Sequence, residues 1–114
     1  MATVQTIPPL IHQIFPEAFE IVNVMDDSLL NEIKDRGVLT KAVTERFIQY
    51  VLTAQNHGSD AVLVACSSIG DCATTARSIL SIPVFKIDEP MAEEAAAKGN
   101  KILVLGTVKS TLDP

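Results

Sequence analysis

The chain has 114 residues, 47% hydrophobic and 20% charged, a composition typical of a single globular domain with its own core. Its net charge of -5, without a cluster of lysines or arginines, argues against nucleic acid as a partner, and no apolar run approaches the ~20 residues of a membrane span. Two cysteines without a paired framework, and no visible signal peptide, favour the reducing cytoplasm.

Along the chain, the first predicted elements are a strand, a helix and a second strand. Residues 4–7 predict a short strand after a polar start. Pro8 and Pro9 suit the first turn of a helix that runs to about Phe19, because the N–H groups of that turn have no helical partner in any case. Residues 21–25 predict the second strand.

Two capped helices follow. Residues 26–28, Asp-Asp-Ser, offer N-caps for a short helix that ends at Gly37. Thr40 can cap a longer helix, which Gly58 closes. The apolar side chains of this longer helix fall on one face at spacings of three and four: Val43, Phe47, Ile48, Val51, Leu52 and Ala54.

The second half of the chain alternates strands and helices. Residues 61–65 are apolar throughout, as expected for a parallel strand buried on both faces. A helix over 71–80, a strand over 84–87, a helix over 90–99 and a strand over 101–105 follow. This order predicts an α/β fold: a three-layer, parallel, flavodoxin-like sheet flanked by helices, with right-handed crossovers.

Cys66 is the main candidate for chemistry, because ligands of parallel sheets bind beyond the carboxyl ends of the strands. It follows the clearest strand and precedes a helix expected to begin near Gly70 or Asp71. The positive end of that helix would stabilise a thiolate, and its free N–H groups, with the hydroxyls of Ser67 and Ser68, would suit a carboxylate. The alternative is that Cys66 is simply a small buried hydrophobic residue.

The other polar candidates have structural explanations. Cys72 is expected to be a core or helix-packing residue, and its spacing from Cys66 matches no usual zinc pattern. His57 suits the end of its helix, and His12 has no visible partner. The acidic residues that follow predicted strands are expected to cap helices: Asp26, Asp27, Asp88 and Glu89. No glycine loop for a dinucleotide or for nucleotide phosphates is present in the sequence.

Residues 64–70, Val-Ala-Cys-Ser-Ser-Ile-Gly, resemble the first catalytic-cysteine segment of the Asp/Glu/hydantoin racemases, in which a cysteine ends a central strand. Other segments are similar to this family in the same order: residues 5–8, 25–30, 87–95 and 105–107, with Thr111. Together these segments cover nearly the whole chain.

The resemblance implies an enzyme without cofactor or metal, built from two similar α/β halves that face each other across a cleft and act on a small carboxylate or amino acid. Each half supplies one cysteine, so that one thiolate removes the α-proton and the other thiol reprotonates the opposite face of the carbon. Cys66 would be the thiol of the first half. Substrate-binding roles are implied for four further residues: Thr6, Ser67, Ser68 and Thr107.

By the same resemblance, residues 1–100 form an N-terminal half-domain of a two-domain racemase fold, and residues 101–114 form its last strand and the lead-in to a second half that is absent. The second catalytic cysteine would lie in that half. Cys72 belongs to the same side of the cleft as Cys66, so we expect no efficient racemisation by this chain alone. The surface left uncovered favours self-association, and a homo-oligomer is expected.

Three functions stay open on the sequence. The first is one half of an amino-acid racemase of the aspartate/glutamate type. The second is a maleate isomerase-like or decarboxylase-like enzyme of the same fold, although the related arylmalonate decarboxylases lack a cysteine at the position of Cys66. The third is a non-catalytic truncated remnant or a binding domain.

Overall fold

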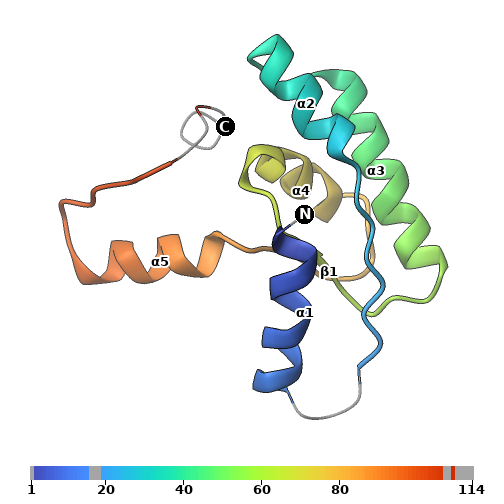
Figure 1. Cartoon of the computed structure of the whole chain (residues 1–114), viewed down its shortest axis with the longest axis horizontal. Coiled ribbons are helices and arrows are strands. Elements are labelled where there is room, and N and C mark those ends of the chain that lie inside the picture. The colour runs from blue at the N-terminus through green and yellow to red at the C-terminus, as the bar shows by residue number, and fades with distance from the viewer. Residues whose placement is uncertain (1, 16–18, 107–108, 110–114) are drawn as a thin grey trace.

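Figure 1 shows the computed structural model of the chain, which describes residues 2–15, 19–106 and 109. Helices flank a small parallel sheet, and the predicted α/β class is confirmed. The elements in chain order are α1 (Ala2–Ile14), α2 (Asp27–Arg36), α3 (Lys41–Asn56), β1 (Val62–Val64), the 3-10 helix η1 (Ser67–Ile69), α4 (Gly70–Arg77), β2 (Val84–Lys86) and α5 (Glu89–Lys98). None of the helices in these ranges is long and apolar enough to cross a membrane.

The sheet consists of β1 and β2, which pair in parallel with Leu63 opposite Phe85. α4 connects the two strands, as expected for a βαβ unit. Val64 and Val84 face the core, whereas Leu63 and Phe85, on the other face, keep 44% and 55% of their surface exposed. The prediction that the strand over 61–65 is buried on both faces is therefore wrong, because within the described residues only the face of Val64 and Val84 belongs to the core.

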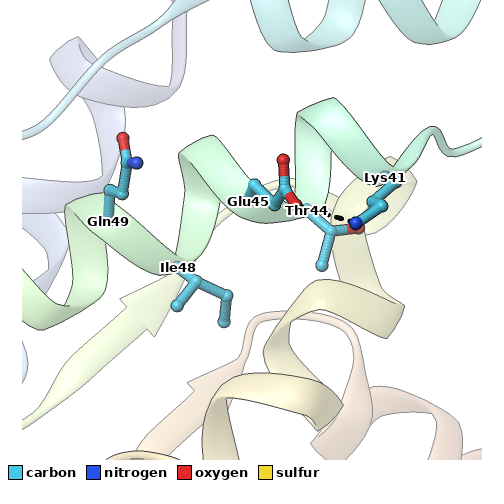
Figure 2. A pocket seen from close by; sticks show the side chains of 5 residues that line it. All are labelled: Lys41, Thr44, Glu45, Ile48 and Gln49. Atoms are coloured by element: carbon cyan, nitrogen blue, oxygen red, sulfur yellow. Dashed lines mark ion pairs between the residues drawn. The ribbon is translucent and has the colours of Figure 1, made fainter.

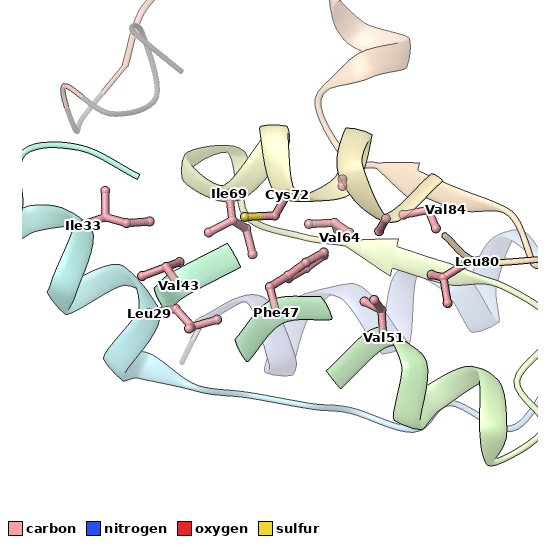
Figure 3. Close-up of a cluster of buried hydrophobic side chains, with 12 residues drawn as sticks. Leu29, Ile33, Val43, Phe47, Val51, Val64, Ile69, Cys72, Leu80 and Val84 are labelled. Carbon is pink, nitrogen blue, oxygen red and sulfur yellow. The ribbon is translucent and has the colours of Figure 1, made fainter. Parts of the chain in front are cut away.

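The core lies between α3, α4 and the covered face of the sheet, with α2 closing one end (Figure 3). Phe47 projects from α3 toward Val64 of β1 and is 6% exposed. Twelve buried hydrophobic residues make up the cluster: Leu29, Ile33, Val43, Phe47, Val51, Val64, Ile69, Cys72, Ala73, Ala76, Leu80 and Val84. The face predicted for the long helix is thus the face that it buries, with Val43, Phe47 and Val51 at its centre.

The caps predicted for α2 and α3 are confirmed. The Asp26 carboxylate accepts a hydrogen bond from the Ser28 N–H at 2.9 Å, and the Thr40 hydroxyl accepts one from the Val43 N–H at 3.2 Å. These bonds satisfy N–H groups that the first turn of a helix leaves unpaired. Gly37 ends α2 in the left-handed region, with φ 71°, where a residue without Cβ is favoured.

A polar network joins α2 to α3 on the surface. The Arg46 guanidinium donates to the Glu32 carboxylate at 2.7 Å and to the Ser28 hydroxyl at 2.9 Å. The Tyr50 hydroxyl donates to the Asp26 carboxylate at 2.8 Å. Asp26 therefore caps α2 and also ties it to α3, and the prediction of a capping role for this residue is confirmed.

This network predicts a contribution to acid stability. Hydrogen bonds from the Ser28 and Tyr50 side chains lower the pKa of the Asp26 carboxyl group from its ordinary value. A lowered pKa in the folded state stabilises the fold above the ordinary carboxyl pKa, and this contribution is lost as the pH falls through the folded value. We expect Asp26→Asn to reduce the change in urea midpoint between pH 7 and pH 3, with the exposed Asp27→Asn as the matched control. Equal pH dependence in wild type and Asp26→Asn would contradict this account.

Three of the predicted strands do not form in the described structure. Residues 4–7 lie within α1, which ends at Ile14 rather than near Phe19 and includes Pro8 and Pro9. Residues 21–25 and 101–105 have no strand partner in the described ranges. A strand gains stability only beside a hydrogen-bonded neighbour, so an apolar run without one remains irregular.

The remaining elements match their predictions closely. The helix predicted over 71–80 spans Gly70–Arg77, the strand predicted over 84–87 spans Val84–Lys86, and the helix predicted over 90–99 spans Glu89–Lys98. β1 ends at Val64 and β2 at Lys86, so a site at the carboxyl edge of the sheet would lie beside the residues that follow these two positions.

Candidate active site

Cys66 lies just beyond the carboxyl end of β1, as predicted. Its thiol is free and half-buried, at the edge of the hydrophobic core rather than within it. The backbone at Cys66 is extended, with φ -140° and ψ 113°, and its carbonyl accepts a hydrogen bond from the Ile69 N–H at 3.3 Å. A 3-10 turn therefore separates the thiol from α4, which the sequence alone did not predict.

The two serines after Cys66 form the first positions of η1. Ser67 is half-buried, and Ser68 is 8% exposed. η1 leads directly into α4 at Gly70, so only the three residues of η1 separate Cys66 from the start of the longer helix. The backbone N–H groups at such a junction form a region of partial positive charge beside Cys66.

Lys86 is a further charged residue at this edge of the sheet. The register places it beside Val64, two residues before Cys66. Its side chain reaches the start of α4: Cε lies 3.3 Å and Nζ 3.5 Å from the point that a Cβ on Gly70 would occupy. Because an ammonium group and a helix N-terminus are both positive, a carboxylate bound between them would be stabilised by both.

Sequence reasoning missed Lys86. The available signal was a lysine at the end of an otherwise apolar strand, since lysine is rarely found buried without a role or a partner. The register of β1 against β2 was needed to bring it near Cys66.

The two threonines implied as substrate contacts have different outcomes. Thr6 lies on α1, with an exposed side chain, so its predicted place at the exit of a first strand is wrong. Thr107 lies outside the described residues. The structure therefore brings together Cys66, Ser67 and Ser68, and adds Lys86 to them.

Cys72 has the structural role predicted for it. The side chain is fully buried on α4 and points into the core, as Figure 3 shows. Its thiol donates to the Thr44 hydroxyl of α3 at 3.6 Å, and burial raises the pKa of the thiol. A thiol with no access to solvent and a raised pKa is unsuited to proton transfer with a substrate.

Glu89 forms an ion pair with Arg77. The Arg77 guanidinium donates to both of its carboxylate oxygens, at 2.9 and 2.5 Å, and these bonds lower the pKa of Glu89. Asp88 stands at the N-cap of α5, as predicted, but its side chain makes no capping hydrogen bond. Across the described ranges, no group of three or more histidine, cysteine, aspartate or glutamate side chains could hold a metal ion.

An open hollow of about 520 Å³ lies along one flank of α3, away from these residues (Figure 2). It is lined by Lys41, Thr44, Glu45, Ile48 and Gln49. All five belong to one helix, and the two charged residues pair with each other at 3.3 Å. The hollow contains none of the strand-end residues, so the candidate site remains the carboxyl edge of the sheet.

Comparison with known families gave a match over nearly the whole chain. The family model described as Asp/Glu/Hydantoin racemase matches residues 2–113. Neither the curated proteins nor the solved structures gave a match. The matched region includes the strand-end cysteine, the two serines and the lysine described above.

Proposed function

Because the chain belongs to the Asp/Glu/Hydantoin racemase family, we propose that it transfers a proton at the carbon next to a substrate carboxylate, with Cys66 as the acid/base group. The family supports a racemase or isomerase type of activity. The observation that supports the role of Cys66 is its position: a free, half-buried thiol at the carboxyl end of β1, followed at once by η1 and α4.

In the proposed reaction, the Cys66 thiolate forms an S–H bond with the α-proton while the C–H electron pair moves toward the carboxylate. The negative charge that develops on the carboxylate oxygens is stabilised by the Lys86 ammonium and by backbone N–H groups at the start of η1 and α4. Ser67 and Ser68 add polar contacts to the same carboxylate. Thr6 and Thr107 remain proposed substrate contacts on the resemblance alone. No cofactor takes part in the proposed step.

Inversion of the carbon needs a second acid/base group on the opposite face, because the thiol that removed the proton can return it only to its own side. Cys72, the other cysteine of the sequence, is buried in the core and does not reach the site. We therefore propose that residues 1–100 form one catalytic half, that residues 101–114 lead toward a second, and that another polypeptide segment supplies the opposite group.

The proposal is tested by proton exchange in D₂O. We expect the purified chain to introduce deuterium at the α-carbon of aspartate or glutamate, followed by NMR, with little inversion of configuration. Lys86→Met should lower kcat/KM for exchange roughly 10- to 100-fold, as expected for loss of a charged hydrogen bond of about 1.5–3 kcal/mol. Lys86→Arg should retain most of the rate, because it keeps the charge.

Lys41→Met is the control, since Lys41 pairs with Glu45 on the exposed flank of α3. Absence of exchange by the wild-type chain with both amino acids, or equal rates for Lys86→Met and Lys41→Met, would contradict the proposed site. Rapid racemisation by the chain alone would contradict the need for a second group.

A further inference from the structure

α5 and the residues after it form an arm, residues 89–106, that stands apart from the core. No residue of α5 is buried, and Figure 1 shows the helix projecting from the body with the following segment away from the sheet. Four consecutive apolar residues in this segment are exposed to solvent: Ile102 at 49%, Leu103 at 84%, Val104 at 66% and Leu105 at 86%. Such a run is typical of a parallel strand buried on both faces.

The sheet offers a complementary surface. Leu63 and Phe85 are exposed on its uncovered face, and Ile87 beside them is 42% exposed. A parallel sheet of two strands is marginal by itself, because parallel sheets are normally covered on both faces and contain more strands. The chain thus carries both an unpaired strand-like segment and an incomplete sheet.

The outer edge of β1 is the one open to an added strand. The Val62 N–H and the Val64 carbonyl bond to the β2 side, so the backbone groups of Leu63 point outward. No strand in the described ranges pairs with that edge. At the outer edge of β2, the Arg77 guanidinium already donates to the Val84 carbonyl at 2.9 Å.

Arg77 also restrains the direction of the arm. Its ion pair with Glu89 holds the first residue of α5 at the β2 side of the sheet. The arm leaves from this side, whereas the open edge belongs to β1, on the far side. A strand contributed by another molecule reaches that edge without crossing the sheet.

The exposed surface is large enough for an interface between two copies. The 12.3-kDa chain exposes 8336 Å², whereas a compact monomer of this mass exposes about 6,100 Å². The exposed apolar residues of the arm and of the sheet contribute to this excess, and a standard stable interface takes ~800 Å² from each partner.

We propose that two copies of this chain exchange arms, so that residues 102–105 of each copy add as a strand to the β1 edge of the other. Leu63 and its neighbours on the uncovered face then pack against the apolar side chains of the incoming segment. The exchange is reciprocal and gives a closed dimer with two-fold symmetry. It involves none of the residues assigned to proton transfer, but it uses residues 102–105, which the proposed function places on the lead toward a second half.

The mass in solution tests this proposal. At about 100 µM, a concentration well above the dissociation constant of a stable interface, we expect light scattering to give twice 12.3 kDa for the wild-type chain. Leu103→Asp combined with Leu105→Asp should give a monomer, and so should Leu63→Asp. Val38→Asp is the matched control, because Val38 is 61% exposed in the link between α2 and α3, and this variant should remain a dimer.

A mixing experiment tests the reciprocity. The arm variant keeps an intact β1 edge and the Leu63→Asp variant keeps an intact arm, so their mixture should form a heterodimer with one of the two contacts. Circular dichroism of each variant verifies that it is folded. A monomeric wild type, a dimer that survives the arm substitutions, or a mixture that stays monomeric would overturn the exchange.

Discussion

Replacing Cys66 with serine is expected to lower the rate of α-proton exchange by about 10²- to 10⁴-fold, the contribution typical of a general acid/base group. Serine has nearly the same size as cysteine, but its hydroxyl does not ionise near neutral pH, so it cannot accept the α-proton as a thiolate does. The initial rate of deuterium incorporation measures this effect. Retention of more than a tenth of the wild-type rate would exclude Cys66 as the base.

The matched control is Cys72→Ser. Cys72 is fully buried and bonded to Thr44, so this substitution should change the stability of the chain more than its exchange rate. Alkylation gives a second comparison of the two thiols. The half-buried Cys66 should react with iodoacetamide before the buried Cys72 in the folded chain, and a bound substrate should slow that reaction.

The second large effect concerns the core. Phe47→Ala should lower the free energy of unfolding by about 3–5 kcal/mol, the range found when a buried aromatic side chain is removed. Phe47 is 6% exposed and lies between α3 and β1, in a cluster of only twelve buried hydrophobic residues. In a domain of this size, such a loss is a large part of the total stability. Urea unfolding followed by circular dichroism measures it.

Phe15→Ala is the control for the same chemical change at the surface. Phe15 is 54% exposed and makes an edge-to-face contact with Phe19 at 5.6 Å between ring centres. Its removal should cost about 1 kcal/mol or less. Similar losses for Phe47→Ala and Phe15→Ala would show that the cluster around Phe47 does not hold the fold together.

The elements that the sequence predicted well are those with local signals. Thr40 and Gly37 mark helix ends by their own hydrogen bonds and backbone angles, so neither depends on the rest of the chain. The spacing of apolar residues likewise identified the buried face of α3. The capped helices and the strands that became β1 and β2 were therefore predictable from the sequence.

The strands that failed depend on distant partners. Residues 102–105 are apolar throughout, like residues 61–65, yet only the latter lie beside a second strand in the described structure. The preference of a segment for the strand conformation depends largely on packing against neighbouring strands, and the sequence of the segment does not show which strands lie beside it. The same reason applies to residues 4–7, where the structure has a helix.

The residues of the candidate site likewise differ in whether they could be predicted from the sequence. Cys66 and its two serines were predicted because the apolar run over 61–65 ends directly before them. Lys86 was not, because its proximity to Gly70 follows from the register of two strands and from the direction of a long side chain.

Gly70 leaves room for the end of the Lys86 side chain beside the first turn of α4. A methyl group at this position would lie 3.3 Å from Lys86 Cε, closer than most such atoms approach, so the end of the lysine side chain would have to shift by a few tenths of an ångström. The position of a charged group at the carboxyl edge of the sheet thus depends in part on a residue that has neither charge nor side chain.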